Sequence, residues 1–157
     1  WGQRSEWNHD VELPWGDLQD DRHAGLQRLV RDLNLLYRDQ PALHRLDCSG
    51  AGFEWVMADE RQHSVFAWLR RDEQGYPVLV VSNMTPVPRP GWRLGVPEGA
   101  TRWREALNTD SAYYGGSNMG NGVAAAGLPV QAVPAHGRRL SITINLPPLA
   151  TLFFVPI

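Results

Sequence analysis

The spacing of apolar residues near the N-terminus predicts one amphipathic helix over residues 22–38. Apolar side chains recur there every three or four residues, which places them on one helical face. They are Leu26, Leu29, Val30, Leu33 and either Leu36 or Tyr37. Asp20 and Asp21 precede this stretch and suit the positive end of a helix. Pro41 is expected to end it, because the residue before a proline is pushed out of the α region.

Beyond residue 50 the pattern changes to alternation, which predicts β-strands. Residues 64–70 alternate two sets of apolar side chains, and residues 78–81 form a β-branched apolar run. Strands are expected at 53–57, 64–70, 78–81, 92–96, 102–107, 140–146 and 151–155. About seven short strands separated by turn residues favour a mainly β fold, an antiparallel sandwich or a barrel.

The segments between these elements are interpreted as loops and turns. Residues 1–16 follow neither period, and the Gly- and Ala-rich stretch 112–137 is expected to be a long loop. Prolines at 86, 88 and 90, followed by Gly91, indicate a turn or an edge rather than a central strand. A single amphipathic helix ahead of a β domain lacks a partner for its apolar face. The simplest interpretation is the last helix of a preceding domain followed by a complete β domain, and a first residue Trp1 instead of Met agrees with that interpretation.

Composition narrows the function classes. The chain has 157 residues and a single cysteine, Cys48, which excludes an internal disulfide framework and fits a reducing, cytoplasmic setting. No apolar run approaches the roughly 20 residues of a membrane-spanning helix. A net charge of −2 gives no drive towards nucleic acid or anionic membranes. All fifteen cationic residues are arginines, which excludes both a P-loop lysine and a Schiff-base lysine.

Candidate chemistry is sparse in the sequence. The five histidines lack metal-ligand spacing, and no serine lies in a nucleophile-elbow context. The glycine-rich stretch 115–122 lacks the Lys-Ser/Thr ending of a phosphate loop. Acidic residues of the N-terminal loop do not define a catalytic carboxylate pair. We therefore expect no metal and no cofactor.

The seven tryptophans are the strongest compositional feature, because flat aromatic faces suit both protein cores and sugar rings. Trp55 and Trp68 lie in strand patterns and are predicted to be core residues. Trp7 lies in a polar loop beside Asn8, His9 and Asp10, a mixture of stacking face and hydrogen-bonding groups. Two interpretations of Trp7 stay open: it contacts a ligand, or it is an ordinary loop residue.

Several stretches, taken in order, are specific for one family. They are Glu6-Trp7-Asn8-His9-Asp10, His23 to Asn34, Ser82-Asn83-Met84-Thr85-Pro86-Val87-Pro88, Trp103 to Asp110, Gly115-Gly116-Ser117-Asn118 and Leu146 to Thr151. Together they resemble the C-terminal end of bacterial 1,4-alpha-glucan (glycogen) branching enzymes, in the alpha-amylase superfamily. The resemblance runs essentially along the whole chain.

The resemblance implies an architecture of two parts. Residues 1–45 would be the end of a catalytic (β/α)8 barrel, with residues 1–21 as the loop after strand 8 and residues 22–39 as helix 8. Residues 46–157 would be the C-terminal β-sandwich. Active sites of such barrels lie on the side of these loops.

The resemblance also implies a glycosyltransferase activity for the parent protein, in glycogen biosynthesis. An Asp would attack an α-1,4 bond while a Glu protonates the leaving oxygen, and a second Asp would stabilise the transition state. A 6-hydroxyl of another glucan would then capture the covalently bound chain and form an α-1,6 branch. These carboxylates would lie on earlier barrel strands, so no catalytic residue is expected in this chain. Although Asn8-His9-Asp10 imitates a catalytic His-Asp pair, its position just before the last barrel helix argues against that role. Trp7, Asn8, His9 and Asp10 are hypothesised as glucan contacts at the active-site rim.

The fragment is thus expected to be structural and inactive alone, with the missing barrel and, through the parent enzyme, alpha-glucan as partners. Two alternatives stay open. The β domain could be a glucan-binding module that acts by aromatic stacking, which exposed and coplanar aromatic rings would favour. The chain could also be the equivalent tail of a related amylase-family enzyme.

Overall fold

The computed structural model describes residues 2–3, 6–122 and 126–157. Residues 1, 4–5 and 123–125 lie outside the described part, so the structure does not bear on the interpretation of Trp1.

The N-terminal third contains the predicted helix. A short 3-10 turn, η1 (Trp15–Gln19), leads into the helix α1 (Asp21–Asp39), and two further turns, η2 (Pro41–Leu43) and η3 (Gly50–Gly52), follow it. The side chain of Asp20 accepts a hydrogen bond of 2.9 Å from the backbone N–H of Arg22 and so caps the helix. Hydrogen bonds from Arg22 lower the pKa of Asp20 to about 2. The predicted helix and its acidic cap are therefore confirmed.

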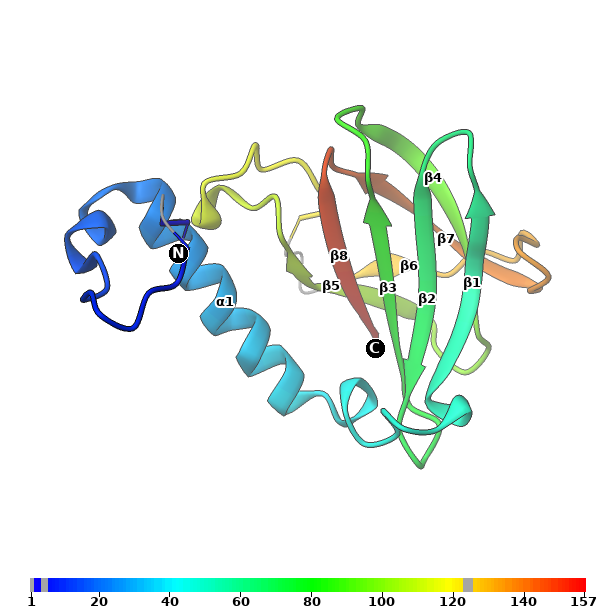
Figure 1. Ribbon diagram of the computed structural model, residues 1–157. Helices are drawn as coiled ribbons and strands as arrows, with labels where there is room; N and C mark the ends of the chain where they lie inside the picture. The colour runs from blue at the N-terminus through cyan, green and yellow to red at the C-terminus, as the bar shows by residue number, and fades with distance from the viewer. Residues whose placement is uncertain (1, 4–5, 123–125) are drawn as a thin grey trace.

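The rest of the chain forms antiparallel strands in two sheets (Figure 1). The strands are β1 (Phe53–Glu60), β2 (Val65–Arg71), β3 (Pro77–Asn83), β4 (Arg89–Val96), β5 (Arg102–Asn108), β6 (Leu128–Pro129), β7 (Leu140–Leu146) and β8 (Ala150–Pro156). A six-stranded sheet has the order β1-β2-β3-β8-β5-β6, and β4 pairs with β7 in a second sheet. A turn, η4 (Ala112–Tyr114), lies in the long segment after β5.

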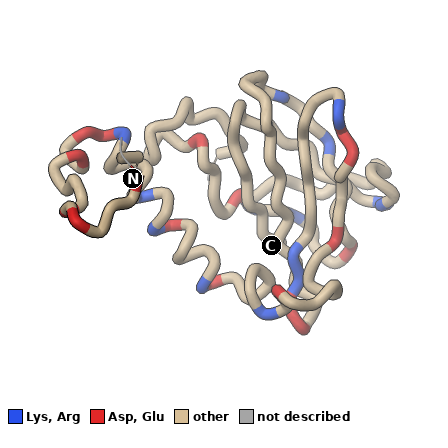
Figure 2. Tube along the Cα trace, in the orientation of Figure 1, with Lys and Arg blue, Asp and Glu red and all other residues tan. Residues whose placement is uncertain are grey.

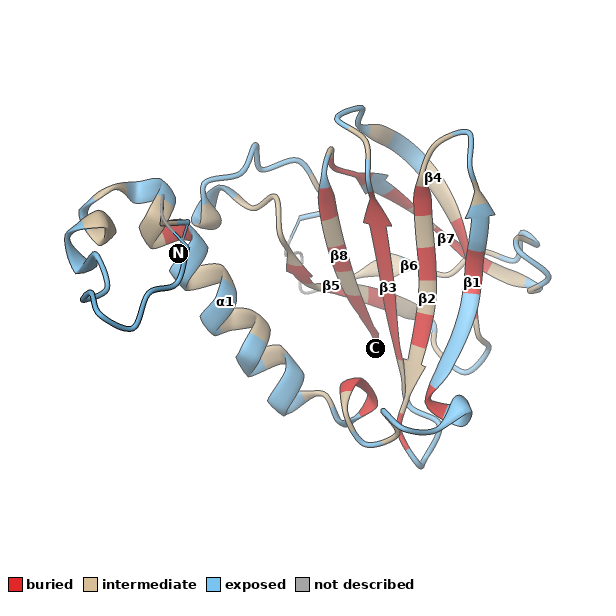
Figure 3. Ribbon diagram, viewed as in Figure 1, coloured by how far each residue is buried: buried red, intermediate tan, exposed pale blue. Residues whose placement is uncertain are grey.

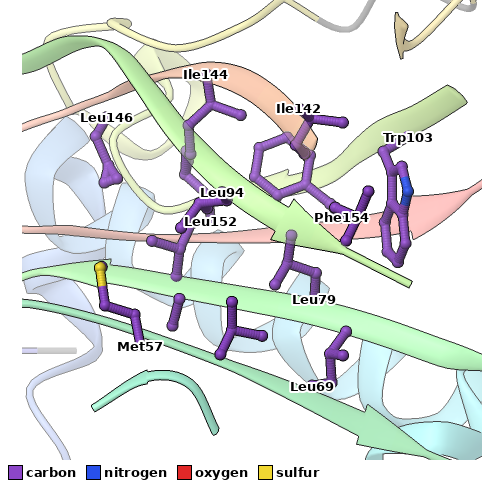
Figure 4. Packing of buried hydrophobic residues seen from close by; sticks show 14 of the residues in the cluster. Met57, Leu69, Leu79, Leu94, Trp103, Ile142, Ile144, Leu146, Leu152 and Phe154 are labelled. Atoms are coloured by element: carbon purple, nitrogen blue, oxygen red, sulfur yellow. The ribbon is translucent and has the colours of Figure 1, made fainter. Parts of the chain in front are cut away.

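The main core fills the space between the two sheets. Ile142, Ile144 and Leu94 from the two-stranded sheet point towards Leu79 and Leu152 of the larger sheet (Figure 4). All five side chains are buried. Because β3 has apolar side chains on both faces, it lies at the centre of its sheet, as its β-branched run indicates. The predicted mainly β sandwich is confirmed.

β4 is an edge strand that carries both a proline and an irregularity in its pairing. Pro90 and Gly91 belong to β4, at the point where its pairing with β7 becomes irregular between Arg89 and Trp92. A proline is tolerated there, because a bulge leaves backbone groups unpaired in any case.

The prediction that Trp55 and Trp68 are core residues is wrong for Trp55. A bulge in β1 between Trp55 and Met57 places Val56 and Met57 both in the core and leaves Trp55 on the outer face, 51% exposed. Trp68 is half-buried on the same outer face, opposite Trp55 in the strand pairing. It packs there against a second, smaller apolar cluster that includes Val80.

The apolar residues of α1 divide between two environments. Leu33 and Leu36 are half-buried and lie towards the β domain, where they line a cavity with Trp68. Tyr37 lines the same cavity, whereas Leu26 and Val30, nearer the start of the helix, do not line it and are 36% and 50% exposed. Figure 3 shows a helix with partly covered and open positions beside a sheet whose central strands are buried. The single apolar face of the sequence pattern is therefore partly covered near its C-terminal end and open nearer its start.

Candidate functional site

The hypothesised rim residues form a compact exposed turn ahead of η1. Asn8 accepts a hydrogen bond of 2.9 Å at its Oδ1 from the backbone N–H of Asp10. His9 Nε2 lies 3.1 Å from Asp10 Oδ1, and the His9 ring lies 5.9 Å from the centre of the Trp7 ring. Trp7 is 78% exposed. The structure thus brings all four residues together with an open aromatic face.

This N-terminal segment is acidic. Acidic positions mark the segment before α1, and arginines follow along the helix (Figure 2). Among the residues that the structure describes, no three His, Cys, Asp or Glu side chains are grouped so that they could hold a metal ion. The turn offers hydrogen-bonding groups and an aromatic plane, which is the chemistry of a sugar contact.

A second aromatic surface, which sequence reasoning missed, lies on the outer face of β1 and β2. Phe53 and Trp55 contact each other edge-on at 5.0 Å between ring centres, and Trp55 contacts Trp68 edge-on at 6.1 Å. Phe53 is 40% exposed. Interplanar angles of 88° and 74° mean that the three rings do not form one flat platform. Trp55 is the most exposed of the three rings, at 51%. The alternation in β2 could have indicated an outer aromatic face, but the bulge in β1 has no local signal.

Next to these rings, a cavity of about 460 Å³ separates α1 from the sheet. Leu33, Val80 and Phe153 provide apolar walls. Its polar side carries Asp47, which accepts hydrogen bonds from Tyr37 at 3.2 Å and from Arg70. The Arg70 hydrogen bond lowers the pKa of Asp47, whereas partial desolvation raises the pKa of Tyr37. The C-terminal half of α1 thus faces the sheet across this cavity.

At its N-terminal half α1 meets the loop after β5. Gly25 is the buried residue of the helix, and a Cβ atom there would lie 2.3 Å from the backbone oxygen of Tyr114. Only glycine permits this approach of two backbones. The expected long loop of residues 112–137 contains η4 and the short strand β6. The two adjacent tyrosines, Tyr113 and Tyr114, are the available sequence signal for the contact with α1.

No helix among the described residues has the length and apolarity needed to cross a membrane.

The family follows from comparison with known proteins. Residues 55–157 match the family described as the alpha amylase C-terminal all-beta domain. The match covers every strand from within β1 onwards, in agreement with the two-sheet architecture. The chain belongs to this family.

Curated proteins similar to this chain include 1,4-alpha-glucan branching enzymes. The chain is 58% identical over 153 residues to the enzyme of Ralstonia nicotianae, which covers 96% of this chain and 19% of that relative. It is 55% identical over 155 residues to the enzyme of Pseudomonas putida, covering 99% of the chain and 20% of the relative. It is 58% identical over 153 residues to the enzyme of Cupriavidus pinatubonensis, covering 96% of the chain and 20% of the relative. The chain therefore spans about a fifth of the length of these relatives, and the resemblance seen in the sequence is confirmed.

Proposed function

We propose that this chain is the C-terminal part of a cytoplasmic 1,4-alpha-glucan branching enzyme, in which α1 closes the catalytic barrel and the β domain packs beside it. The exposed apolar residues of α1 support this proposal most directly. Leu26 is 36% exposed and Val30 is 50% exposed, whereas Leu33 and Leu36, further along the helix, lie towards the β domain. Exposed apolar patches of this kind mark protein interfaces. The lone Cys48 suits the reducing location.

In this proposal the catalytic residues lie in the barrel, and this chain contributes residues at the rim of the active site. The three catalytic carboxylates of the family's double displacement would stand upstream. Residues 6–20 would lie on the active-site side, because loops that precede barrel helices do so. Trp7 would stack on a glucose ring, while Asn8, His9 and Asp10 would hold its orientation by their mutual contacts.

We expect the 157-residue chain alone to show no branching of amylose, and the full-length protein to branch it, measured by loss of iodine stain. In the full-length protein, Trp7→Ala is expected to lower kcat/KM about threefold to tenfold, the value of one aromatic contact. Val11→Ala is the matched control, since Val11 is an exposed apolar residue of the same segment. Turnover by the chain alone would refute the barrel assignment, and an unchanged Trp7→Ala enzyme would refute the rim contact.

A second candidate function is glucan binding by the β domain itself. It is favoured by one observation, the half-exposed Trp55 with Phe53 against its edge. The crossed orientation of the neighbouring rings limits this surface to stacking of about one sugar ring. Such a contact would add affinity for a long polymer without taking part in the chemistry.

Trp55→Ala is therefore expected to weaken retention of the protein in glycogen-containing gels about threefold to tenfold, with kcat on short soluble glucans unchanged. Tyr76→Ala is the control, because Tyr76 is 63% exposed and lines a different cavity, at the β2–β3 turn. Equal retention of both variants would leave the β domain with a structural role alone.

A further inference from the structure

The loop of residues 108–118 makes a set of polar contacts to α1 that neither sequence pattern nor family match assigns. Arg28 Nε donates a hydrogen bond of 2.9 Å to the backbone oxygen of Tyr113, and its guanidinium lies 5.1 Å from the centre of the Tyr113 ring. Arg31 Nη2 lies 3.0 Å from the Tyr113 hydroxyl oxygen. One tyrosine thus accepts from two arginines on successive turns of the helix.

The adjacent tyrosine contacts the same helix through a carboxylate. The Tyr114 hydroxyl donates to Asp32 Oδ2 at 3.0 Å, and Arg31 Nε donates to Asp32 Oδ1 at 2.8 Å. The Arg31 hydrogen bond lowers the pKa of Asp32, and burial, together with the negative partner, raises the pKa of Tyr114 to about 12. The Tyr113 and Tyr114 rings lie 5.3 Å apart between centres, so Arg31, Asp32 and the two tyrosines form a closed ring of interactions, charged on the helix side at neutral pH.

The loop is held in shape by its own contacts, so it can hold the tyrosines in place. The Asp110 carboxylate accepts from the backbone N–H of Ser117 at 2.9 Å, from the Ser117 hydroxyl at 2.6 Å and from the Met119 N–H at 3.1 Å. Gly116 lies against the backbone of Asp110, where a Cβ atom would come within 2.3 Å of an oxygen. Gly115 adopts a left-handed conformation, φ 91°, directly after Tyr114.

This anchor matters because α1 has few others within the described residues. Its C-terminal half faces the sheet across the cavity of about 460 Å³. Besides contacts with β5 and η2, this half is held by the packing of Leu36 and by the hydrogen bond from Tyr37 to Asp47. The N-terminal half continues directly into η1 through Asp20, which caps α1 and also donates its backbone N–H to Asp17 at 3.0 Å. A displacement of this half would carry residues 6–20 with it.

We infer that residues 108–118 form a latch that positions the N-terminal half of α1, and through it the segment 6–20, relative to the β domain. Tyr113, Tyr114 and Asp32 are positioning residues in this inference and touch no substrate. The expected effect on glucan binding rests on the proposed function, whereas the positioning of α1 by the latch does not.

The test measures amide hydrogen exchange along α1 in the 157-residue chain. Tyr114→Phe removes only the hydroxyl, and the lost bond to a charged partner should make amides of residues 22–32 exchange about tenfold faster. Residues 33–39, beyond the latch, should change less. Tyr76→Phe is the matched control, because its exposed ring lies at the β2–β3 turn, away from α1.

Gly25→Ala is a second variant, for which helix propensity alone and the contact with Tyr114 predict opposite changes in exchange. Alanine raises helix propensity, so an isolated helix would exchange more slowly. The clash with Tyr114 predicts faster exchange in residues 22–32 instead. Unchanged or slower exchange in both variants would overturn the latch.

In the full-length enzyme, Tyr114→Phe is expected to raise KM for glucan about threefold to tenfold with kcat unchanged, because binding residues are misplaced and the reacting groups are not. Asp32→Ala should have the same effect, and the double variant should add little to either single change. Faster exchange with an unaltered KM would support the latch and contradict the glucan contact of residues 7–10. A lower kcat with normal exchange would contradict the latch itself.

Discussion

Replacement of Trp103 by alanine is expected to lower the free energy of unfolding by about 3–5 kcal/mol, the cost of removing a large aromatic side chain from a packed core. Trp103 is fully buried on β5, at one end of the side chains that fill the sandwich (Figure 4). The free energy can be measured by urea denaturation of the chain at constant protein concentration.

Trp103→Phe should lower the free energy of unfolding much less than Trp103→Ala, and the difference has a specific cause. The indole Nε1 of Trp103 is buried without a hydrogen-bond partner among the described residues. An unpaired buried donor costs about 1–3 kcal/mol, so phenylalanine removes a penalty while it leaves a smaller cavity. Trp7→Ala is the surface control and should stay within about 0.5 kcal/mol. Equal losses for Trp103→Ala and Trp103→Phe would contradict this explanation.

Asn83→Ala is expected to destabilise the protein by roughly 3 kcal/mol, because several buried polar groups lose their partner together. Asn83 is 1% exposed at the end of β3. Its Nδ2 donates to the backbone oxygens of Val87 and Pro147, both at 2.9 Å. Its Oδ1 accepts from the backbone N–H of Thr85 at 3.0 Å and from the Thr85 hydroxyl at 2.8 Å. One side chain therefore joins the turn after β3 to the turn before β8.

The variant Asn83→Asp gives this prediction a pH signature. A carboxylate would face two carbonyl oxygens, so the folded state would favour the protonated acid and raise its pKa above the unfolded value of about 3.9. The variant should then be closest to the wild-type protein below pH 4 and lose stability as the pH rises. Thr85→Val removes a single donor and should cost about 1 kcal/mol without this pH dependence. A pH-independent Asn83→Asp variant would contradict the assigned donors.

Local patterns predicted most of the secondary structure. The helix from residue 21 to residue 39 and its Asp20 cap follow from spacing and from the chemistry of helix ends. The strands follow from alternation, and the burial of Val65, Ala67 and Leu69 matches it. The motifs along the chain also indicated the family, because they preserve residue types in order over nearly the whole length.

The candidate site was only partly predictable. Sequence placed Trp7 to Asp10 in a polar loop, and the structure brings them into one exposed turn. It did not indicate that Trp55 would face outward. Strand alternation assumes one residue per position, and the bulge in β1 breaks that assumption between Trp55 and Met57.

The sequence by itself determined the elements, their capping residues and the family, because each depends on neighbours a few positions apart. Only the tertiary structure decided which part of the apolar face of α1 is covered, and that Tyr114, 82 positions away in sequence, holds Asp32. Such pairings depend on how the sheets twist and where loops return, and no periodicity along the chain records them. A buried glycine such as Gly25 acquires its meaning only when the opposing backbone is in place.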